Sequence, residues 1–413
     1  MSTLEIVSIL VAVAAIFGWI SVRVLKLPIT VGTMLLTVVV SFSLTGVGGI
    51  HPPLHAFVVR LVHSIDLRSV ILQGMLPLLL FAGAFLLDLD ELARQKVPVI
   101  LFAIFGTISS IFLVAGLMSL ISGVHVPWIQ YVIFGALISP TDPIAVLEML
   151  RRTGVPNAIR AQLAGESLFN DGIGAVFFLT MISIAAGSAT TPLHVTGILF
   201  LEAGGGIGIG VVAAWITSHL MRRIQAYQID ILLSLSLALG GYVLAEIAGV
   251  SGPLEAVAAG ITLRFLNCRQ PGELISREDV DNFWRVIDEV QNSLLFVLLG
   301  LEIVAVPLDS RIAISGVAAI ASVTIVRFGV VLLLLLAVRQ FHLGHRGSAA
   351  ILTWGGLRGG LSIALALSVP EDLGRSWMLG ATYLVVVFSI IIQGGSMDKL
   401  VRWRRARRAQ VET

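Results

Sequence analysis

Two carboxylates lie five residues apart in one of the more apolar parts of this chain. The stretch GESLFNDGIG, residues 165–174, contains Glu166 and Asp171. On a helix, Ser167 and Asp171 share one stripe, whereas Glu166 and Asn170 share the next, rotated by about 100°. We therefore predict that Ser167 and Asp171 line a cavity, while Glu166 and Asn170 turn towards a neighbouring helix.

A buried Glu166 needs a positive charge nearby, because an unpaired carboxylate is costly away from water. Arg327 and Arg358 both fall inside apolar segments and can supply that charge. Glu166 can act as an ion-pair partner or as an ion ligand, and the sequence leaves both open. For the two arginines we favour charge compensation over binding of substrate.

A second polar cluster is ISPTDPIAV, residues 138–146, where Asp142 stands between Pro140 and Pro143. Each proline removes a backbone donor and frees carbonyl groups about one turn upstream, so we expect the helix to be broken here. The freed carbonyls, the Thr141 hydroxyl and the Asp142 carboxylate are hard oxygen ligands, which suit a small hard cation. The alternative is that Asp142 only caps the broken helix.

The elements that position these groups are membrane helices. The chain has 413 residues, of which 57% are hydrophobic and 13% charged, and its mean hydropathy is +0.97. That is more apolar surface than one soluble core can use. Apolar runs of about 20 residues, the length that crosses the hydrocarbon, predict an all-α polytopic membrane protein of about thirteen spans at 4–22, 29–49, 69–87, 97–121, 128–150, 159–187, 194–220, 228–248, 251–267, 281–304, 311–338, 347–369 and 376–400.

A third cluster, TWGGLRGGLS at residues 353–362, surrounds Arg358 with four glycines in the twelfth span. Such a density of glycine weakens a helix and allows another backbone to approach closely, so we expect a second interruption here. If 194–220 is a linker helix, residues 1–187 and 228–400 form two inverted repeats of six spans, and the interrupted fifth and twelfth spans correspond. Paired interruptions of this kind point to a transport site at the midplane.

The distribution of charge predicts the orientation. With thirteen spans the termini lie on opposite sides of the membrane, and most of the 27 basic residues then fall on the side of the C-terminus, including the basic tail at 403–413. The loops on the other side contribute Arg60, Arg68, Arg311 and Arg375. The positive-inside rule therefore places the C-terminus in the cytoplasm and the N-terminus outside.

The run GGGIGIG, residues 204–210, lacks the Lys-Ser/Thr ending of a phosphate-binding loop and lies within an apolar span. We interpret it as a surface for close helix packing.

Three motifs in this order, TDP at 141–143, GESLFND at 165–171 and GGLRGG at 355–360, resemble those of the bacterial sodium/proton antiporters of the cation:proton antiporter-1 family. That family also includes the animal sodium/proton exchangers. The resemblance covers nearly the whole membrane domain, residues 1–402. It implies a homodimer in the inner cell membrane, with a core domain built around two crossed, unwound helices, which would be spans five and twelve.

The resemblance also implies roles for individual residues. Asp171 would be the carboxylate that binds Na⁺ and H⁺, and Thr141, Ser167 and Glu166 would complete the Na⁺ site. Asp142 would lie at the helix crossing, where Pro143 supports the interruption. Arg327 would pair with Glu166, and Arg358 would have a structural or electrostatic role. The pair Asn170-Asp171 resembles that of the electroneutral branch of the family.

The sequence thus predicts a secondary transporter that exchanges Na⁺ or Li⁺ for H⁺ by alternating access, for sodium and pH homeostasis. No cofactor is expected beyond the transported ions, and no partner beyond the lipid bilayer and a second copy; no nucleic acid is expected. A K⁺/H⁺ exchanger is the nearest alternative, since oxygen ligands alone do not fix the preferred ion. An intramembrane aspartyl protease could use Asp142 and Asp171, but the GxGD signature of that chemistry is missing. A zinc protease lacks HExxH, and a channel does not need a carboxylate that binds protons.

Overall fold

The computed structural model describes residues 3–27, 29–47, 66, 69–142, 146–147, 150, 155–187, 192–224, 226–268, 274–302, 310–339 and 349–411. All secondary structure in these segments is helical. Pro143, which we expected to support the interruption of the fifth span, lies outside the described residues.

The helices before residue 190 are α1 (Thr3–Ile20), η1 (Ser21–Leu25), α2 (Ile29–Val47), η2 (Val70–Met75), α5 (Leu76–Phe85), α6 (Leu89–Arg94), α7 (Lys96–Leu101), η3 (Phe102–Gly106), α8 (Thr107–Ile121), α9 (Trp128–Ile138) and α11 (Asn157–Ala185). Those after it are α12 (Pro192–Met221), α13 (Tyr227–Ser236), η4 (Leu237–Gly241), α14 (Tyr242–Ile247), α15 (Gly252–Cys268), α16 (Leu274–Glu302), α17 (Ser310–Arg339), α18 (Ala349–Trp354), α19 (Gly360–Ser368), η6 (Glu371–Leu373), α20 (Arg375–Phe388), η7 (Ser389–Gly394) and α21 (Gly395–Val411).

Prolines mark where two of the central helices begin. Pro127 precedes α9 and Pro156 precedes α11, each with an extended backbone conformation. Proline suits this place because it has no N–H to leave unpaired and its φ is already fixed near the helical value.

The helices agree with the expected spans to within a few residues, with three differences. The helix predicted at 281–304 begins earlier, at Leu274, and so includes an acidic first half. The last helix continues to Val411, which makes the basic tail a helical extension rather than a separate segment. A short helix, α6, stands in a predicted loop, where the Asp88 side chain caps it by accepting a hydrogen bond from the Glu91 backbone at 3.2 Å.

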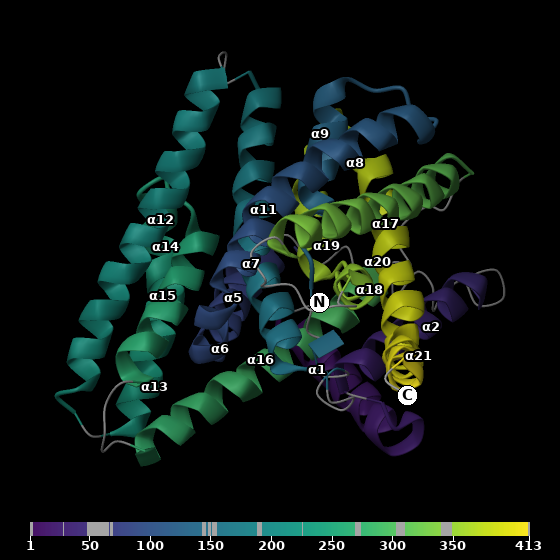
Figure 1. The fold of residues 1–413 in the computed structure, drawn as a ribbon. Coiled ribbons are helices and arrows are strands. Elements are labelled where there is room, and N and C mark those ends of the chain that lie inside the picture. Colours follow the sequence, from purple (N-terminus) through teal and green to yellow (C-terminus); the bar gives the residue numbers. More distant parts are fainter. Residues whose placement is uncertain are drawn as a thin grey trace.

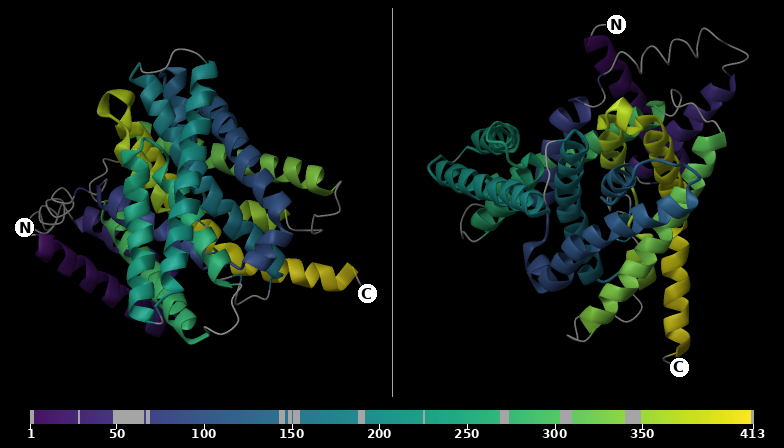
Figure 2. Two further views of the ribbon diagram at one scale, coloured as in Figure 1. Left: turned by 90° about the vertical axis from the view of Figure 1, so that its left-hand side faces the viewer. Right: turned by 90° about the horizontal axis from the view of Figure 1, so that it is seen from above.

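The helices form two groups on either side of α11 (Figure 1). In one group, α12 packs along α15, which also packs against α5. In the other, α17 packs against α20 and α8, and α8 against α9. Helix α16 runs along the base of the molecule in Figure 1. In the two views of Figure 2, α1 and α21 lie at opposite edges of the molecule.

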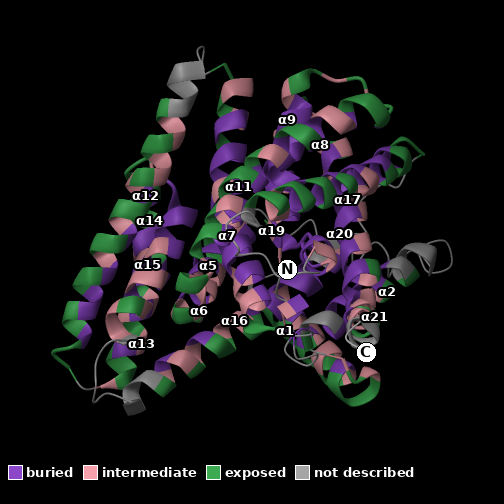
Figure 3. Cartoon of the chain, viewed as in Figure 1, coloured by how far each residue is buried: buried purple, intermediate pink, exposed green. Residues whose placement is uncertain are grey.

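The surface of the outer helices is apolar. Figure 3 shows that α12 and α17 carry many exposed residues, and these include the large side chains of Phe200, Trp215, Val317 and Phe328. Seven helices within the described segments are long and apolar enough to cross a membrane. The remaining expected spans correspond to helices that are shorter, interrupted or more polar, as expected of helices buried within a membrane bundle rather than facing lipid.

The glycine-rich stretch of α12 is a packing surface, as the sequence predicted. A Cβ atom on Gly206 would overlap the Ser251 carbonyl oxygen at the start of α15, whereas a Cβ on Gly208 would meet nothing within 4 Å.

Candidate cation site

The site is built where two interrupted helices cross beside α11. After α9 ends at Ile138, residues 139–142 are not helical, and residues 356–359 separate α18 from α19 in the same way. The backbone N–H of Asp142 donates a hydrogen bond of 2.8 Å to the carbonyl oxygen of Leu357. The two breaks that the sequence predicted are therefore joined directly, backbone to backbone.

Glycine allows this close approach. A Cβ atom on Gly359 would overlap the Asp142 side chain, so a larger residue at 359 would force the two interrupted segments apart. At this position the glycine admits the Asp142 side chain, whereas the close approach of the two backbones occurs at Leu357.

The carbonyl groups freed at the end of α9 are satisfied by an arginine from the other interrupted helix. The guanidinium Nη1 of Arg358 donates to the carbonyl oxygens of Ser139 and Pro140, the second at 2.9 Å. Arg358 is buried, with 2% of its surface exposed. Its positive charge lies at a helix C-terminus, where the helix dipole favours a cation. Its expected role in charge compensation stays a prediction.

Asn170 of α11 satisfies the polar groups of Thr141. Its Oδ1 accepts a hydrogen bond from the Thr141 backbone N–H at 3.2 Å, and its Nδ2 donates to the Thr141 hydroxyl at 2.7 Å. The Ser167 hydroxyl lies 2.8 Å from the Thr141 hydroxyl and also donates to the Thr141 carbonyl oxygen. A hydroxyl that gives its hydrogen to a protein acceptor keeps oxygen lone pairs for a cation.

Glu166 and Asn170 turn away from the cavity, as their shared stripe predicted. Glu166 is paired with the guanidinium of Arg327 on α17, and the side chains of the two are only 2% and 7% exposed. Arg327 also donates to the Leu352 carbonyl oxygen at 3.0 Å, which ties α11 and α17 to α18. The sequence left Arg327 and Arg358 as possible partners of Glu166, and in the structure the partner is Arg327.

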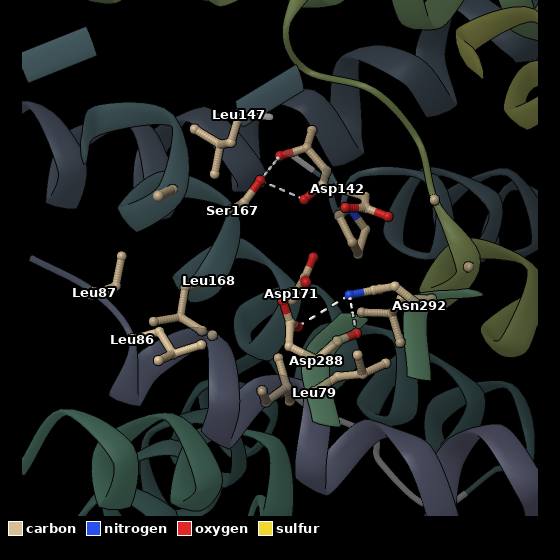
Figure 4. Close-up of a pocket in the computed structure, with 18 of the residues that line it drawn as sticks. Leu79, Leu86, Leu87, Asp142, Leu147, Ser167, Leu168, Asp171, Asp288 and Asn292 are labelled. Atoms are coloured by element: carbon tan, nitrogen blue, oxygen red, sulfur yellow. Dashed lines mark hydrogen bonds between the residues drawn. The ribbon is translucent and has the colours of Figure 1, made fainter. Parts of the chain in front are cut away.

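Ser167 and Asp171, the other stripe, line a cavity of about 370 Å³ together with Thr141 and Asp142 (Figure 4). Glu166 is not among the lining residues, so the cavity holds three of the four residues expected to bind Na⁺. Asp171 is the one carboxylate of α11 in contact with this space.

The cavity has further polar residues that the sequence analysis did not select. They comprise Asp88 and Glu91 at the start of α6, Asn157 and Arg160 of α11, Asp288 and Asn292 of α16, and Ser362 of α19. Among the lining residues that the structure describes, Arg160 is the one positive side chain against five carboxylates, so the space favours a cation. A signal for the α16 residues was present, because Asp281, Asp288 and Asn292 follow one helical face, but nothing in the sequence placed that face beside Asp171.

Comparison with known proteins gives a consistent result. Residues 11–403 match the family described as sodium/hydrogen exchanger, transmembrane. The chain is 37% identical over 408 residues to the Na(+)/H(+) antiporter NhaP of Pseudomonas aeruginosa, covering 97% of this chain and 96% of that protein. It is 31% identical to the Na(+)/H(+) antiporter NhaH of Halobacillus dabanensis, covering 81% and 83% of the two chains.

The solved structure of the sodium proton antiporter MjNhaP1 from Methanocaldococcus jannaschii at pH 8 superposes with a TM-score of 0.73 over 97% of this chain and 99% of that one. At 18% sequence identity this likeness shows the fold.

Proposed function

This chain belongs to the sodium/hydrogen exchanger family, and we propose that it exchanges Na⁺ or Li⁺ for H⁺ at the carboxylate of Asp171. It is a secondary transporter and not an enzyme. The observation that carries the assignment is that Asp171 opens into a cavity with a strong excess of carboxylates, beside hydroxyl groups at a helix crossing.

One carboxylate is enough for exchange. If Na⁺ and H⁺ compete for Asp171, each crossing of the membrane carries one ion or the other, and a proton gradient drives sodium in the opposite direction without ATP. Thr141 and Ser167 supply hydroxyl oxygens, and Asp142, from the interrupted segment after α9, adds negative charge to the same cavity (Figure 4). The expected role of Glu166 as a fourth ligand stays a prediction. In this structure the Glu166 carboxylate is paired with Arg327 and does not line the cavity.

The residues that line the cavity indicate the side of the membrane to which it opens. Asp88, Glu91, Asn157 and Arg160 line it and lie next to the loops that the positive-inside rule assigns to the cytoplasm. We therefore propose that the cavity opens to the cytoplasm, with the C-terminus on that side and the N-terminus outside. Alternating access would then come from movement of the interrupted helices and α11 against the group that contains α12 and α15.

Three further proposals rest on the resemblance. The pair Asn170-Asp171 supports exchange of one ion for one proton, without net transfer of charge. A homodimer in the inner cell membrane, and the two inverted repeats separated by α12, follow from the organisation of the family. Sodium and pH homeostasis is the corresponding physiological role.

The test is proton flux in sealed vesicles that contain the purified protein and a pH-sensitive dye. Addition of Na⁺ or Li⁺ to the wild-type protein is expected to move protons, and the variant Asp171→Asn is expected to abolish this flux while the protein remains folded. Robust sodium-driven flux in that variant would overturn the assignment of the site. The same measurement with K⁺ tests the alternative of a potassium exchanger, and an imposed membrane potential that changes the rate would contradict electroneutral exchange.

A further inference from the structure

A carboxyl group lies buried outside the cavity, in the group of helices that contains α12 and α15. Glu255 is in the first turn of α15, and 0% of its surface is exposed. Neither of its carboxyl oxygens has a hydrogen-bond partner, and it forms no ion pair with the residues that the structure describes. The exchange proposed at Asp171 gives this group no role.

The carboxyl group packs directly against the backbone of a neighbouring helix. A Cβ atom on Gly241, the last residue of η4, would overlap Oε1 of Glu255 and lie 3.2 Å from its Oε2. On α12, a Cβ on Gly210 would overlap the backbone carbonyl oxygen of Glu255. The two glycines thus let their helices close around this residue, and Figure 1 shows α12, α14 and α15 together in one group. Because no surface of Glu255 is exposed, no water-sized space adjoins it, and neither a water molecule nor a hydrated metal ion can satisfy its oxygens.

The start of α15 does not satisfy the carboxyl group either. Side-chain oxygens at a helix start can accept hydrogen bonds from free N–H groups, and the helix dipole favours a negative charge there. In α15 this part is taken by Ser251, whose hydroxyl accepts a hydrogen bond from the Leu254 N–H at 3.2 Å. The dipole alone contributes little compared with the cost of burying an unpaired charge.

The helices packed against α15 provide no compensating charge. They are α5, α11, α12, η4 and α14. Their charged and titratable residues are Arg160, Glu166 and Asp171 in α11, His194, Glu202 and His219 in α12, and Tyr242 and Glu246 in α14, whereas α5 and η4 contain none. Of the basic side chains that the structure describes, Arg160 lies in the wall of the cavity and His219 bonds to Arg223. Neither is paired with Glu255.

We propose that Glu255 is a proton-binding site, separate from the transport cavity, that holds its proton while α15 is packed against η4 and α12. A carboxyl group that is buried without a partner is far less unfavourable when neutral than when ionised. A proton is also the one cation that needs no space beyond the carboxyl group itself. Loss of the proton would leave an uncompensated charge against the backbone of Gly241, and this charge favours separation of α15 from η4.

The packing of α15 extends to the helix that carries Asp171. A Cβ atom on Gly172, the residue after Asp171, would overlap the side chain of Leu254, the residue before Glu255. The proton on Glu255 therefore stabilises the helix against which α11 packs at Gly172, and it makes the stability of this packing depend on pH.

The first experiment compares the pH dependence of thermal unfolding in detergent for the wild type and Glu255→Gln. Unfolding exposes the carboxyl group to water, where it is ionised at neutral pH, so rising pH favours unfolding of the wild type through the release of one proton. Glutamine has nearly the same shape and has no proton to release. The Tm of the wild type should therefore fall, relative to that of Glu255→Gln, by about 3 °C for each unit of pH between about pH 6 and pH 8.

Two further variants complete the comparison. Glu246→Gln removes an exposed carboxylate of α14, and its Tm should run parallel to that of the wild type at every pH. Glu255→Met removes the polar atoms and should show the same pH dependence as Glu255→Gln. A difference in Tm between the wild type and the two Glu255 variants that does not change with pH would overturn the proposal, because it would show that Glu255 is ionised in the folded protein as well.

Infrared spectroscopy of the folded protein detects the proton directly. The carbonyl stretch of protonated carboxyl groups, identified by its shift in D₂O, should lose the contribution of one group at pH 7 in Glu255→Gln and be unchanged in Glu246→Gln. An unchanged band in Glu255→Gln would refute the proton on Glu255. Neither measurement needs transport, so absence of sodium-driven flux in the wild type would refute the exchange at Asp171 and not this site.

Discussion

The buried pair of Glu166 and Arg327 gives a test of how the site is held together. The two side chains are 2% and 7% exposed, and their charges meet between α11 and α17. The perturbation is a set of three variants: Glu166→Gln, Arg327→Met, and the two combined. Glu166→Gln leaves a buried guanidinium without its counter-charge, and Arg327→Met leaves a buried carboxylate, whereas the double variant leaves neither.

The expected loss in the free energy of unfolding follows from the burial of the two charges. Removing one partner of a buried ion pair costs about 3–5 kcal/mol, because the remaining charge stays out of water without compensation. If the two changes were independent, the double variant would lose about 6–10 kcal/mol. We expect it to lose no more than a single variant does, since a neutral pair in the same space carries no uncompensated charge. The coupling between the two sites should then reach about 3 kcal/mol.

The assay is thermal unfolding in detergent, followed by tryptophan fluorescence. At roughly 2 °C per kcal/mol for a chain of this size, each single variant should lower Tm by about 6–10 °C. A matched control is Asp398→Asn, which removes the exposed i,i+4 partner of Arg402 on α21, where the side chains are 42% and 78% exposed. An exposed pair is worth about 1 kcal/mol at most, so this variant should change Tm by 2 °C or less.

One result would refute the reasoning: additive losses in the double variant would show that the two side chains do not depend on each other. The same variants also test the expected role of Glu166 as a fourth ligand. A stable double variant with a strongly raised KM for Na⁺ would show that Glu166 binds the ion as well as pairing with Arg327. Recovery of both stability and KM in the double variant would leave Asp171, Ser167 and Thr141 as the ligands.

Three further results are expected. Gly206→Ala should destabilise the protein by about 1–3 kcal/mol, because the new Cβ would overlap the Ser251 carbonyl oxygen. Gly208→Ala should be neutral, since nothing lies within 4 Å of a Cβ at that position. Equal Tm values for the two variants would contradict close packing of α12 on α15. Arg358→Met should lower stability by roughly 2–4 kcal/mol, because it leaves two carbonyl oxygens at the end of α9 without their charged donor, and Arg358→Lys should recover part of this loss in the same thermal assay. The apparent KM for Na⁺ should rise as pH falls, by up to about tenfold per pH unit, because protons compete for Asp171 and mass action favours the more abundant ligand; a KM that does not depend on pH would argue against a shared carboxylate.

Much of the fold and part of the site could be predicted from the sequence because they depend on local rules. Apolar runs fix helix positions through the thickness of the hydrocarbon, and prolines and glycines mark the two interruptions. The helical repeat separates the stripe of Ser167 and Asp171 from that of Glu166. The structure confirms this by placing Ser167 and Asp171 in the cavity wall and Glu166 against α17.

The rest of the site depends on contacts between segments that are distant in sequence. Asn292 is more than a hundred residues from Asp171, and helical periodicity gives its face but not the neighbour of that face. The choice between Arg327 and Arg358 as the partner of Glu166 was open for the same reason, because both lie in apolar segments and only the packing of α17 on the central helices decides it. The short helix α6 was missed because its cap and acidic first turn lie in a segment too polar to be read as a span.

The polar groups at the crossing are satisfied by the protein itself. In the proposed exchange, this would let one carboxylate change its ligand while the hydrogen bonds of the crossing stay in place. The freed carbonyl oxygens of α9 bind Arg358, the N–H of Asp142 binds Leu357, and the N–H of Thr141 binds Asn170. None of these bonds includes the transported ion, so in the proposed exchange they would persist whether Na⁺, H⁺ or neither is bound. Asp171 lies next to this network and lines the cavity. Under that proposal, the occupancy of Asp171 would change in each cycle while the hydrogen bonds of the crossing stay in place.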